Sequence, residues 1–251
     1  MISNWAEIIR MNLQANFNLD FSKVSESIKN GQLYSDISQF LDSIDNTIDR
    51  EIATFLKILA ENGYPPIEMT INDTIDVLEL NNLSTEEREK RVKEYINSIY
   101  TQDEIVKIIN HWDEVEWIDV NRKYILKDAI QANFEGRYNL SIPSLLPHLE
   151  GIIVEGLDFN SRMKPGELSQ LIKSILDEED VFDTALNNYY LDNILIGFTH
   201  GNAPRSFLSR HSILHGNDIN YGNHDNSLKL ILLLDYTIDK LEQYRKYKSQ
   251  V

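Results

Sequence analysis

The sequence predicts an all-α protein. Ten glycines, six prolines and 42% hydrophobic side chains among 251 residues are typical of a globular chain built mostly from helices. Apolar residues recur every three or four positions over long stretches, which is the period of an amphipathic helix. Two capping boxes also mark helix starts in the first half of the chain. The length allows either one large domain or two smaller ones.

The N-terminal part is expected to form helices over residues 5–18 and 36–62. Apolar positions in the second stretch fall on one helix face, and Gly63-Tyr64-Pro65-Pro66 ends it because neither proline fits a helix interior. Residues 71–80 fit a strand as well as a helix, and their pattern does not decide between the two.

Capping boxes begin the next two helices, at about residues 85 and 102. Ser84-Thr85-Glu86-Glu87 and Thr101-Gln102-Asp103-Glu104 place a hydroxyl and an acidic side chain where each can accept from the other's backbone N–H. The acidic and aromatic stretch 111–119 follows. We take it as the boundary between an acidic N-terminal helical region, residues 1–114, and a helical bundle, residues 115–251, although no Gly, Ser or Pro linker marks it.

The second half begins with two predicted helices. Gly136 ends one that spans residues 122–135, and Ser141-Ile142-Pro143 opens another that runs to residue 154. Residues 158–166 contain asparagine, proline and glycine and are expected to form a loop.

Four further helices are predicted beyond this loop. Two span residues 167–177 and 181–196. The third begins at the N-cap Asn202, with Pro204 in its first turn, and ends at Gly216. A polar loop over residues 217–226 leads to a closing helix that ends at about residue 246. Because residues 228–234 of this helix are apolar almost all round, it should be buried on several sides.

The third of these helices carries Arg210, His211 and His215. On a wheel of about 100° per residue, one arc of about 160° contains Arg210, Leu214, Phe207, His211, His215 and Leu208. A guanidinium is a permanent forked phosphate ligand, and a histidine can give or take a proton near neutral pH. His215 would also lie at the helix C-terminus, where the macrodipole favours the imidazolium form. This combination suits metal-free cleavage of a phosphodiester.

The segment Arg210-His211-Ser212-Ile213-Leu214-His215-Gly216, followed by a loop and an apolar helix, resembles the motif of the HEPN superfamily (higher eukaryotes and prokaryotes nucleotide-binding). Members carry an Arg, usually a polar residue next, and a His four to six positions after the Arg. The order of helices over roughly residues 115–248 is also similar. The resemblance implies a HEPN-like bundle and a metal-independent endoribonuclease that needs no cofactor, with a site assembled from two motifs across a homodimer interface. Members of this sort serve as toxins or phage-defence effectors.

In that reading, Arg210 binds and polarises the scissile phosphate, and His215 acts as general acid or base on the ribose 2′-OH or the leaving oxygen. His211 orients or stabilises its neighbours. Cleavage leaves a 2′,3′-cyclic phosphate and a 5′-hydroxyl, because an internal 2′-OH is a well-placed nucleophile that needs no metal.

Other interpretations of the motif remain open. The arginine can pair with an acid while the histidines are satisfied core residues. The two histidines also have the i, i+4 spacing of helical zinc ligands, with His200, Asp218, His224 or Asp225 as a third ligand. A non-catalytic HEPN-like binding or scaffold protein, which dimerises or captures a partner, is the competing function.

The charge distribution limits where RNA can bind. The formal net charge is −16, which opposes broad nucleic-acid binding through a basic surface. Residues 1–120 contribute −13 and residues 121–251 contribute −3, whereas from Arg205 onward seven basic side chains exceed five acidic ones. RNA contact therefore belongs near the motif, and a protein partner or antitoxin fits the acidic N-terminal region.

Several function classes lack sequence support. There is no cysteine for disulfides, thiolate zinc sites or cysteine nucleophiles, and no phosphate-binding or hydrolase motif. Any structural metal must rely on His, Asp and Glu. The sequence contains no run of about 18 apolar residues, so it predicts no membrane span. Residues 1–7 lack the pattern of a signal peptide. We therefore expect a cytoplasmic location.

Three other groups stand out in the sequence. The acids of residues 177–180 are typical of a solvated turn rather than a cation site. Trp112 and Trp117 are expected to be buried, although a partner-binding patch is the alternative. The tyrosines that could stack on bases, and that otherwise belong to the core or the helix surface, are Tyr190, Tyr221, Tyr236 and Tyr244.

Overall fold

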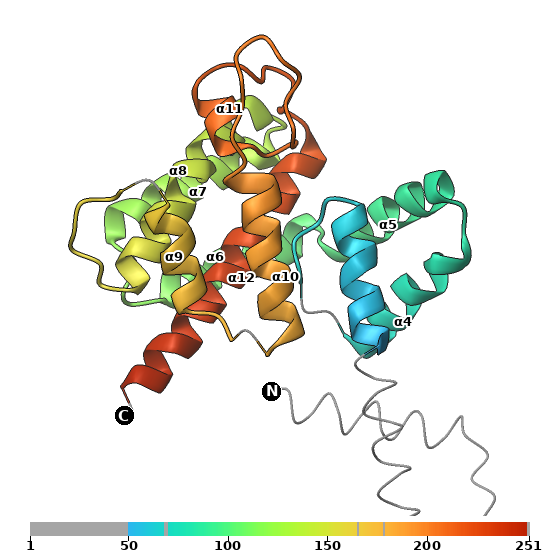
Figure 1. Ribbon diagram of the computed structural model, residues 1–251, viewed down its shortest axis with the longest axis horizontal. Coiled ribbons are helices and arrows are strands. Elements are labelled where there is room, and N and C mark those ends of the chain that lie inside the picture. The colour runs from blue at the N-terminus through green and yellow to red at the C-terminus, as the bar shows by residue number, and fades with distance from the viewer. Residues whose placement is uncertain (1–49, 68–69, 165, 178, 250–251) are drawn as a thin grey trace, which may run out of the picture. The chain divides into compact units, whose positions relative to one another are not determined.

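The computed structural model confirms the all-α prediction for the residues that it describes, which are 50–67, 70–164, 166–177 and 179–249 (Figure 1). Helices are the only regular secondary structure in these ranges. The chain divides into two compact units, residues 1–58 with 69–83 and residues 59–68 with 84–251. The predicted helix 5–18 and the first part of the predicted helix 36–62 lie outside the described residues.

The first unit resolves the ambiguity at residues 71–80 in favour of a helix. The described part of this unit begins with residues 50–58 of a helix that spans residues 50–61. It also contains α4 (Ile71–Glu79) and the 3₁₀ turn η1 (Leu80–Asn82). Thr70 caps α4, because its hydroxyl oxygen accepts the Asp73 N–H at 3.3 Å. The hydrophobic pattern of residues 71–80 does not predict this helix by itself, because it fits the period of a strand as well as that of a helix.

The second unit contains the remaining helices. In chain order they are α5 (Thr85–Ile99), α6 (Gln102–Glu114), α7 (Val120–Phe134), α8 (Tyr138–Gly156), α9 (Glu167–Ser174), α10 (Val181–Tyr189), the π-helical turn η2 (Tyr190–Ile194), α11 (Arg210–Leu214) and α12 (His224–Lys248). The sequence boundary at residues 114 and 115 falls inside this unit, between α6 and α7.

The helix starts follow the predicted caps only in part. The Ser84 hydroxyl accepts the Glu87 N–H at 3.4 Å and begins α5. Thr101 precedes α6 but makes no side-chain capping bond, and the acidic residues Asp103 and Glu104 in the first turn complement the helix dipole there. Both helices therefore begin where predicted, for two different physical reasons.

Helix α8 is longer than predicted and contains Pro143 in its interior. A proline at this position has no N–H for the carbonyl of Asn139, four residues earlier. The hydroxyl of Tyr221 donates to that carbonyl at 3.3 Å. This tertiary bond gives the Asn139 carbonyl a donor in place of the missing helical N–H, and the helix continues through Pro143 and Pro147.

Helix α12 forms the centre of the second unit and packs chiefly on α8. Every residue from Asn226 to Leu234 is buried. The two helices approach closely at Ser141 and Ser227, whose hydroxyl oxygens lie 3.2 Å apart. The predicted burial of the closing helix is confirmed, and the single chain achieves it. The apolar character of this helix therefore gives no separate reason for a dimer.

One charged residue lies inside this apolar run. The ammonium group of Lys229 donates to the carbonyl oxygen of Asn62 at 3.0 Å and lies 4.6 Å from the ring centre of Tyr64. Burial lowers the pKa of Lys229. The lysine thus connects α12 to the turn at residues 62–64.

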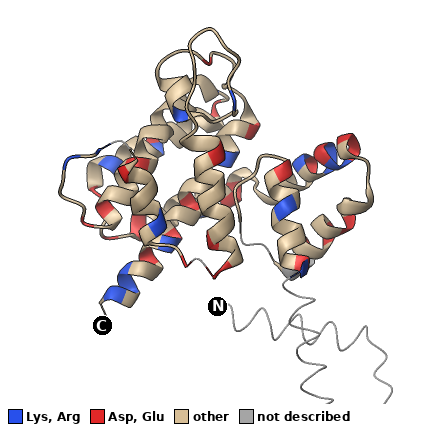
Figure 2. Cartoon of the chain, in the orientation of Figure 1, with Lys and Arg blue, Asp and Glu red and all other residues tan. Residues whose placement is uncertain are grey.

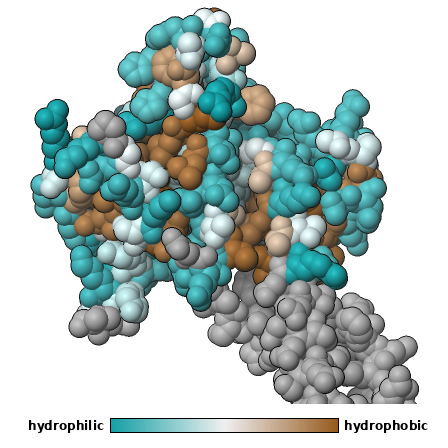
Figure 3. All heavy atoms as spheres, in the orientation of Figure 1, coloured by the Kyte–Doolittle hydropathy of each residue, from teal (hydrophilic) through white to brown (hydrophobic). Residues whose placement is uncertain are grey.

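The charged and apolar side chains are unevenly distributed over the second unit. Figure 2 shows Lys and Arg on the last turns of α12, which carry Arg245, Lys246 and Lys248. In Figure 3 the visible face is largely hydrophilic, and apolar residues gather on it in several patches. None of the helices in the described ranges has the length and apolar character of a membrane span.

Candidate functional site

The three motif residues lie on or directly after α11, a helix of only five residues. Figure 1 shows α11 among loops at one end of the second unit, with the C-terminal end of α12 at the other end. Ser209 caps α11: its hydroxyl accepts the Ser212 N–H at 3.3 Å and donates to the Ile196 carbonyl at 3.0 Å. Gly216, with φ of +72°, ends it as predicted.

The prediction of a helix from Asn202 to Gly216 is wrong for its first half. Residues 202–209 are not helical, and the N-cap is Ser209 instead of Asn202. The Ser206 hydroxyl donates to the Asn193 carbonyl at 2.9 Å and accepts the Leu208 N–H. These side-chain bonds take the place of the backbone bonds that a helical turn would make. Phe207 and Leu208 therefore do not share a helix face with the motif. Phe207 is 70% exposed and Leu208 is buried.

Arg210 is paired with an acid. Its Nη2 lies 2.5 Å from Oε2 of Glu150, which comes from α8, and about four fifths of each side chain is buried. The Nε atom of Arg210 is buried and has no hydrogen-bond partner among the described residues. The ion pair fixes the guanidinium against α8. A phosphate that binds there must compete with, or sit beside, the Glu150 carboxylate.

The two motif histidines lie next to each other on the surface. Their rings are nearly parallel, with centres 6.1 Å apart and an angle of 11° between planes. Phe198 stacks on His215 at 5.8 Å, and His200 meets Phe198 edge-on at 4.8 Å. The result is a row of four rings beside Arg210, and its three histidines, His211, His215 and His200, are exposed.

The environment of His211 favours its neutral form. Partial burial, followed by the positive charge of Arg210 and by His215, lowers the pKa of His211, and Glu150 acts in the opposite direction. A ring that stays neutral near pH 7 can accept a proton. The core-histidine interpretation does not fit this arrangement, because neither motif histidine is buried.

Among the described residues, none of the four candidate third ligands, His200, Asp218, His224 and Asp225, forms a three-ligand group with the histidine pair. Asp225 pairs with Lys93 at 2.5 Å, the buried Asp218 accepts the N–H of Asn220, and His224 packs edge-on against Tyr138. In the described ranges, the one group of three His, Asp or Glu residues with ligand atoms within 4.8 Å of one another lies elsewhere, at His111, Asp239 and Glu242.

The acidic stretch 177–180 has local structural roles. Asp180 caps α10 by accepting the N–H groups of Phe182 and Asp183, and Asp177 accepts the N–H of Glu179 at 3.0 Å. These bonds form a helix cap and a turn, of which the sequence indicated only the turn.

Most of the remaining aromatic candidates are engaged in packing. Trp112 is buried, and Trp117 is half-buried and lies 5.8 Å from the guanidinium of Arg245. The Tyr190 hydroxyl bonds to the Thr237 hydroxyl at 2.6 Å, and Tyr236 is buried. None of these side chains is as exposed as the histidine rings beside Arg210.

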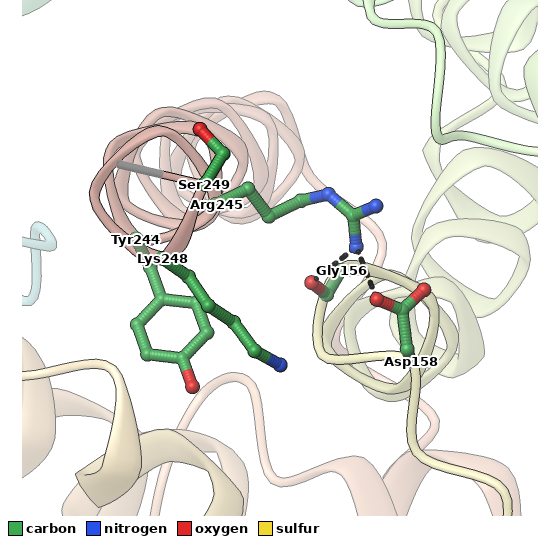
Figure 4. Close-up of a pocket in the computed structure, with 6 residues that line it drawn as sticks. All are labelled: Gly156, Asp158, Tyr244, Arg245, Lys248 and Ser249. Carbon is green, nitrogen blue, oxygen red and sulfur yellow. Dashed lines mark hydrogen bonds and ion pairs between the residues drawn. The ribbon is translucent and has the colours of Figure 1, made fainter. Parts of the chain in front are cut away.

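A small pocket of about 210 Å³ lies at the far end of α12. Figure 4 shows its lining: Gly156, Asp158, Tyr244, Arg245, Lys248 and Ser249. Within it, Arg245 donates to the Gly156 carbonyl at 2.8 Å and to Asp158 at 3.1 Å. The guanidinium is thus committed to the protein itself, and the pocket contains none of the motif residues.

Sequence reasoning missed two features near these helices. Glu150 was not singled out as the partner of Arg210, and the group of His111, Asp239 and Glu242 was not recognised. Arg210 and Glu150 are 60 positions apart, and His111 and Asp239 are 128 positions apart, so no spacing motif reveals either pairing. Comparison of the chain with protein-family models, with curated proteins and with solved structures found no match.

Proposed function

We propose that this protein is a metal-independent endoribonuclease of the HEPN type, with Arg210, His211 and His215 as its site. The observation that carries the proposal is the exposed, stacked pair of histidine rings beside a fixed arginine. Phosphodiester cleavage by a 2′-OH needs a base, an acid and a cation for the phosphate, and these three side chains supply one of each.

The positions of the side chains suggest a division of labour. Arg210 binds the phosphate, with Glu150 as the residue that positions the guanidinium. His211, whose pKa is lowered, accepts the proton of the 2′-OH, a larger role than orientation alone. His215 donates a proton to the departing 5′-oxygen. The 2′-oxygen–phosphorus bond forms as the 5′-oxygen–phosphorus bond breaks, which leaves a 2′,3′-cyclic phosphate and a 5′-hydroxyl.

The neighbouring rings support RNA as the substrate. Single-stranded bases are commonly bound by stacking on aromatic side chains and histidines. Phe198 and His200 extend the row of rings beyond His215 and so provide a surface for a base next to the cleaved phosphate. We further propose that two copies of α11 meet in a homodimer and that the protein acts as a toxin or defence effector, with the acidic N-terminal region as the contact for a protein partner.

The direct test is incubation of the purified chain with total RNA in EDTA, at a temperature well below its melting point. We expect cleavage with cyclic phosphate at the new 3′ ends. Arg210→Lys and His211→Ala should lose at least about a hundredfold in rate, the contribution of a positioned acid or base. His224→Ala is the matched control, since it removes a different exposed histidine. Light scattering should show a dimer at micromolar concentration, and a strict monomer would contradict the composite site.

A non-catalytic binding protein is the second candidate, and one observation favours it. Glu150 already neutralises Arg210, and the whole chain carries a net charge of −16. If wild-type protein cleaves no RNA while the exposed ring surface still holds a partner or a second copy, this candidate replaces the ribonuclease.

A further inference from the structure

A second group of chemically capable side chains joins α6 to α12. His111 on α6 faces two carboxylates of α12, with Nε2 2.9 Å from Oδ1 of Asp239 and 3.7 Å from Oε2 of Glu242. One potential ligand atom from each residue lies within 4.8 Å of the others. Since Asp239 and Glu242 are three positions apart on one helix, they project from the same face.

We propose that His111, Asp239 and Glu242 bind one divalent transition-metal ion, with Zn²⁺ as the best match. Zn²⁺ in proteins takes imidazole nitrogen and carboxylate oxygen at about 2.0–2.2 Å, so ligand atoms around a tetrahedral ion lie about 3.4 Å apart. The separations of 2.9 and 3.7 Å bracket that value. Water completes the fourth position.

The charge balance of the group points to a cation. Two carboxylates face a single histidine, and in the part of the chain that the structure describes no Lys or Arg forms an ion pair with Asp239 or Glu242. A third carboxylate, that of Asp235, lies one turn earlier on α12 and adds negative charge. An ion of charge +2 would neutralise two of these groups at once.

The surroundings hold the ligands in place before an ion arrives. Trp112, adjacent to His111, is buried and donates its indole N–H to Oδ1 of Asp235 at 2.8 Å. This bond fixes α6 against α12, one helical turn from the proposed ligands. The side chains of the three ligands are between a quarter and a half exposed, so an ion can enter from solvent.

The site is separate from the proposed ribonuclease site and does not depend on it. Asp239 lies 15 residues after the start of α12, or about 22 Å along the helix axis. Because the ion would tie α12 to α6, we expect it to stabilise the second unit. Removal of the ion should lower stability and leave RNA chemistry to Arg210 and the α11 histidines.

The test uses the intact chain, purified without a histidine tag, stripped with EDTA and dialysed. Calorimetric titration with Zn²⁺ should show one equivalent bound, and Zn²⁺ should raise the melting temperature. His111→Gln and Asp239→Asn should each weaken Zn²⁺ binding at least about tenfold. Circular dichroism identifies any variant that fails to fold, and Glu242→Gln serves as a further single-ligand variant.

The histidine pair on α11 provides the decisive control. The double variant His211→Ala, His215→Ala should keep the binding at α6 and α12 unchanged. Mg²⁺ should give no shift in melting temperature, because it prefers octahedral oxygen ligands. Three outcomes would overturn the proposal: no Zn²⁺ binding by wild type, binding that disappears only in the α11 double variant, or an equal response to Mg²⁺.

Discussion

α11 and α12 are neighbours in the sequence and differ in almost every physical respect. α12 has 25 residues, and the stretch from Asn226 to Leu234 is buried all round. α11 has five residues, is held by Ser209 and by two buried side chains, Ser212 and Ile213, and exposes both histidines. The proposed chemistry thus lies on a short helix that contributes only two buried side chains to the core. The two helices should respond in opposite ways to mutation.

The largest expected effect is on stability in α12. Leu230→Ala removes a fully buried side chain and should lower the free energy of unfolding by about 2–5 kcal/mol. Leu214→Ala on α11 is the matched control, because that leucine is 42% exposed, and it should cost about 0.5 kcal/mol. Urea unfolding of the two variants measures the contrast. Equal losses would mean that α11 belongs to the core.

A smaller loss is expected where α8 touches α12. A methyl group at Gly156 would lie 2.8 Å from both terminal carbons of the fully buried Leu241. Gly156→Ala should therefore destabilise the protein by about 1–2 kcal/mol, since overpacking outweighs the gain in helix propensity. Gly197→Ala, which meets nothing within 4 Å, is the control for thermal melting. A rise in melting temperature for the Gly156 variant would show that the two helices can separate slightly at no cost.

Asp235, which lies one turn from the proposed metal ligands, should make the free energy of unfolding depend on pH. Burial, followed by the charge of Asp239, raises the pKa of Asp235 to about 6, against the opposing effects of Trp112 and His111. Between its ordinary pKa and this value the folded state binds more protons than the unfolded state. The contribution of Asp235 to stability is therefore present at about pH 4 and is lost as the pH rises to about 7.

Asp235→Asn should remove this contribution, since the amide oxygen still accepts from Trp112 and carries no charge at either pH. The measurement is the difference in unfolding free energy between wild type and variant in EDTA, near pH 4 and near pH 7. The variant should gain relative to wild type as the pH rises. A difference that stays constant would contradict the raised pKa.

The contrast between α11 and α12 also explains what could be predicted from the sequence. The closing helix was predictable because its apolar residues must be buried, whatever covers them. The start of the motif helix was not, because Asn202 with Pro204 looks like a helix start, while a hydrogen bond from Ser206 to Asn193 decides the backbone. The pairing of Arg210 with Glu150 and the approach of His111 to α12 depend on helix packing, which no local pattern contains.

Cleavage and melting of His215→Ala, measured on one preparation beside wild type, decide whether this histidine is catalytic or structural. His215, the residue directly after α11, is exposed and should transfer a proton. RNA cleavage in EDTA should therefore fall by about 10²-fold to 10⁴-fold, while the melting temperature should change by less than about 2 °C, the shift for a surface substitution in a chain of this size. A lower melting temperature for the variant, with no cleavage by wild type, would contradict the account and make His215 a structural residue.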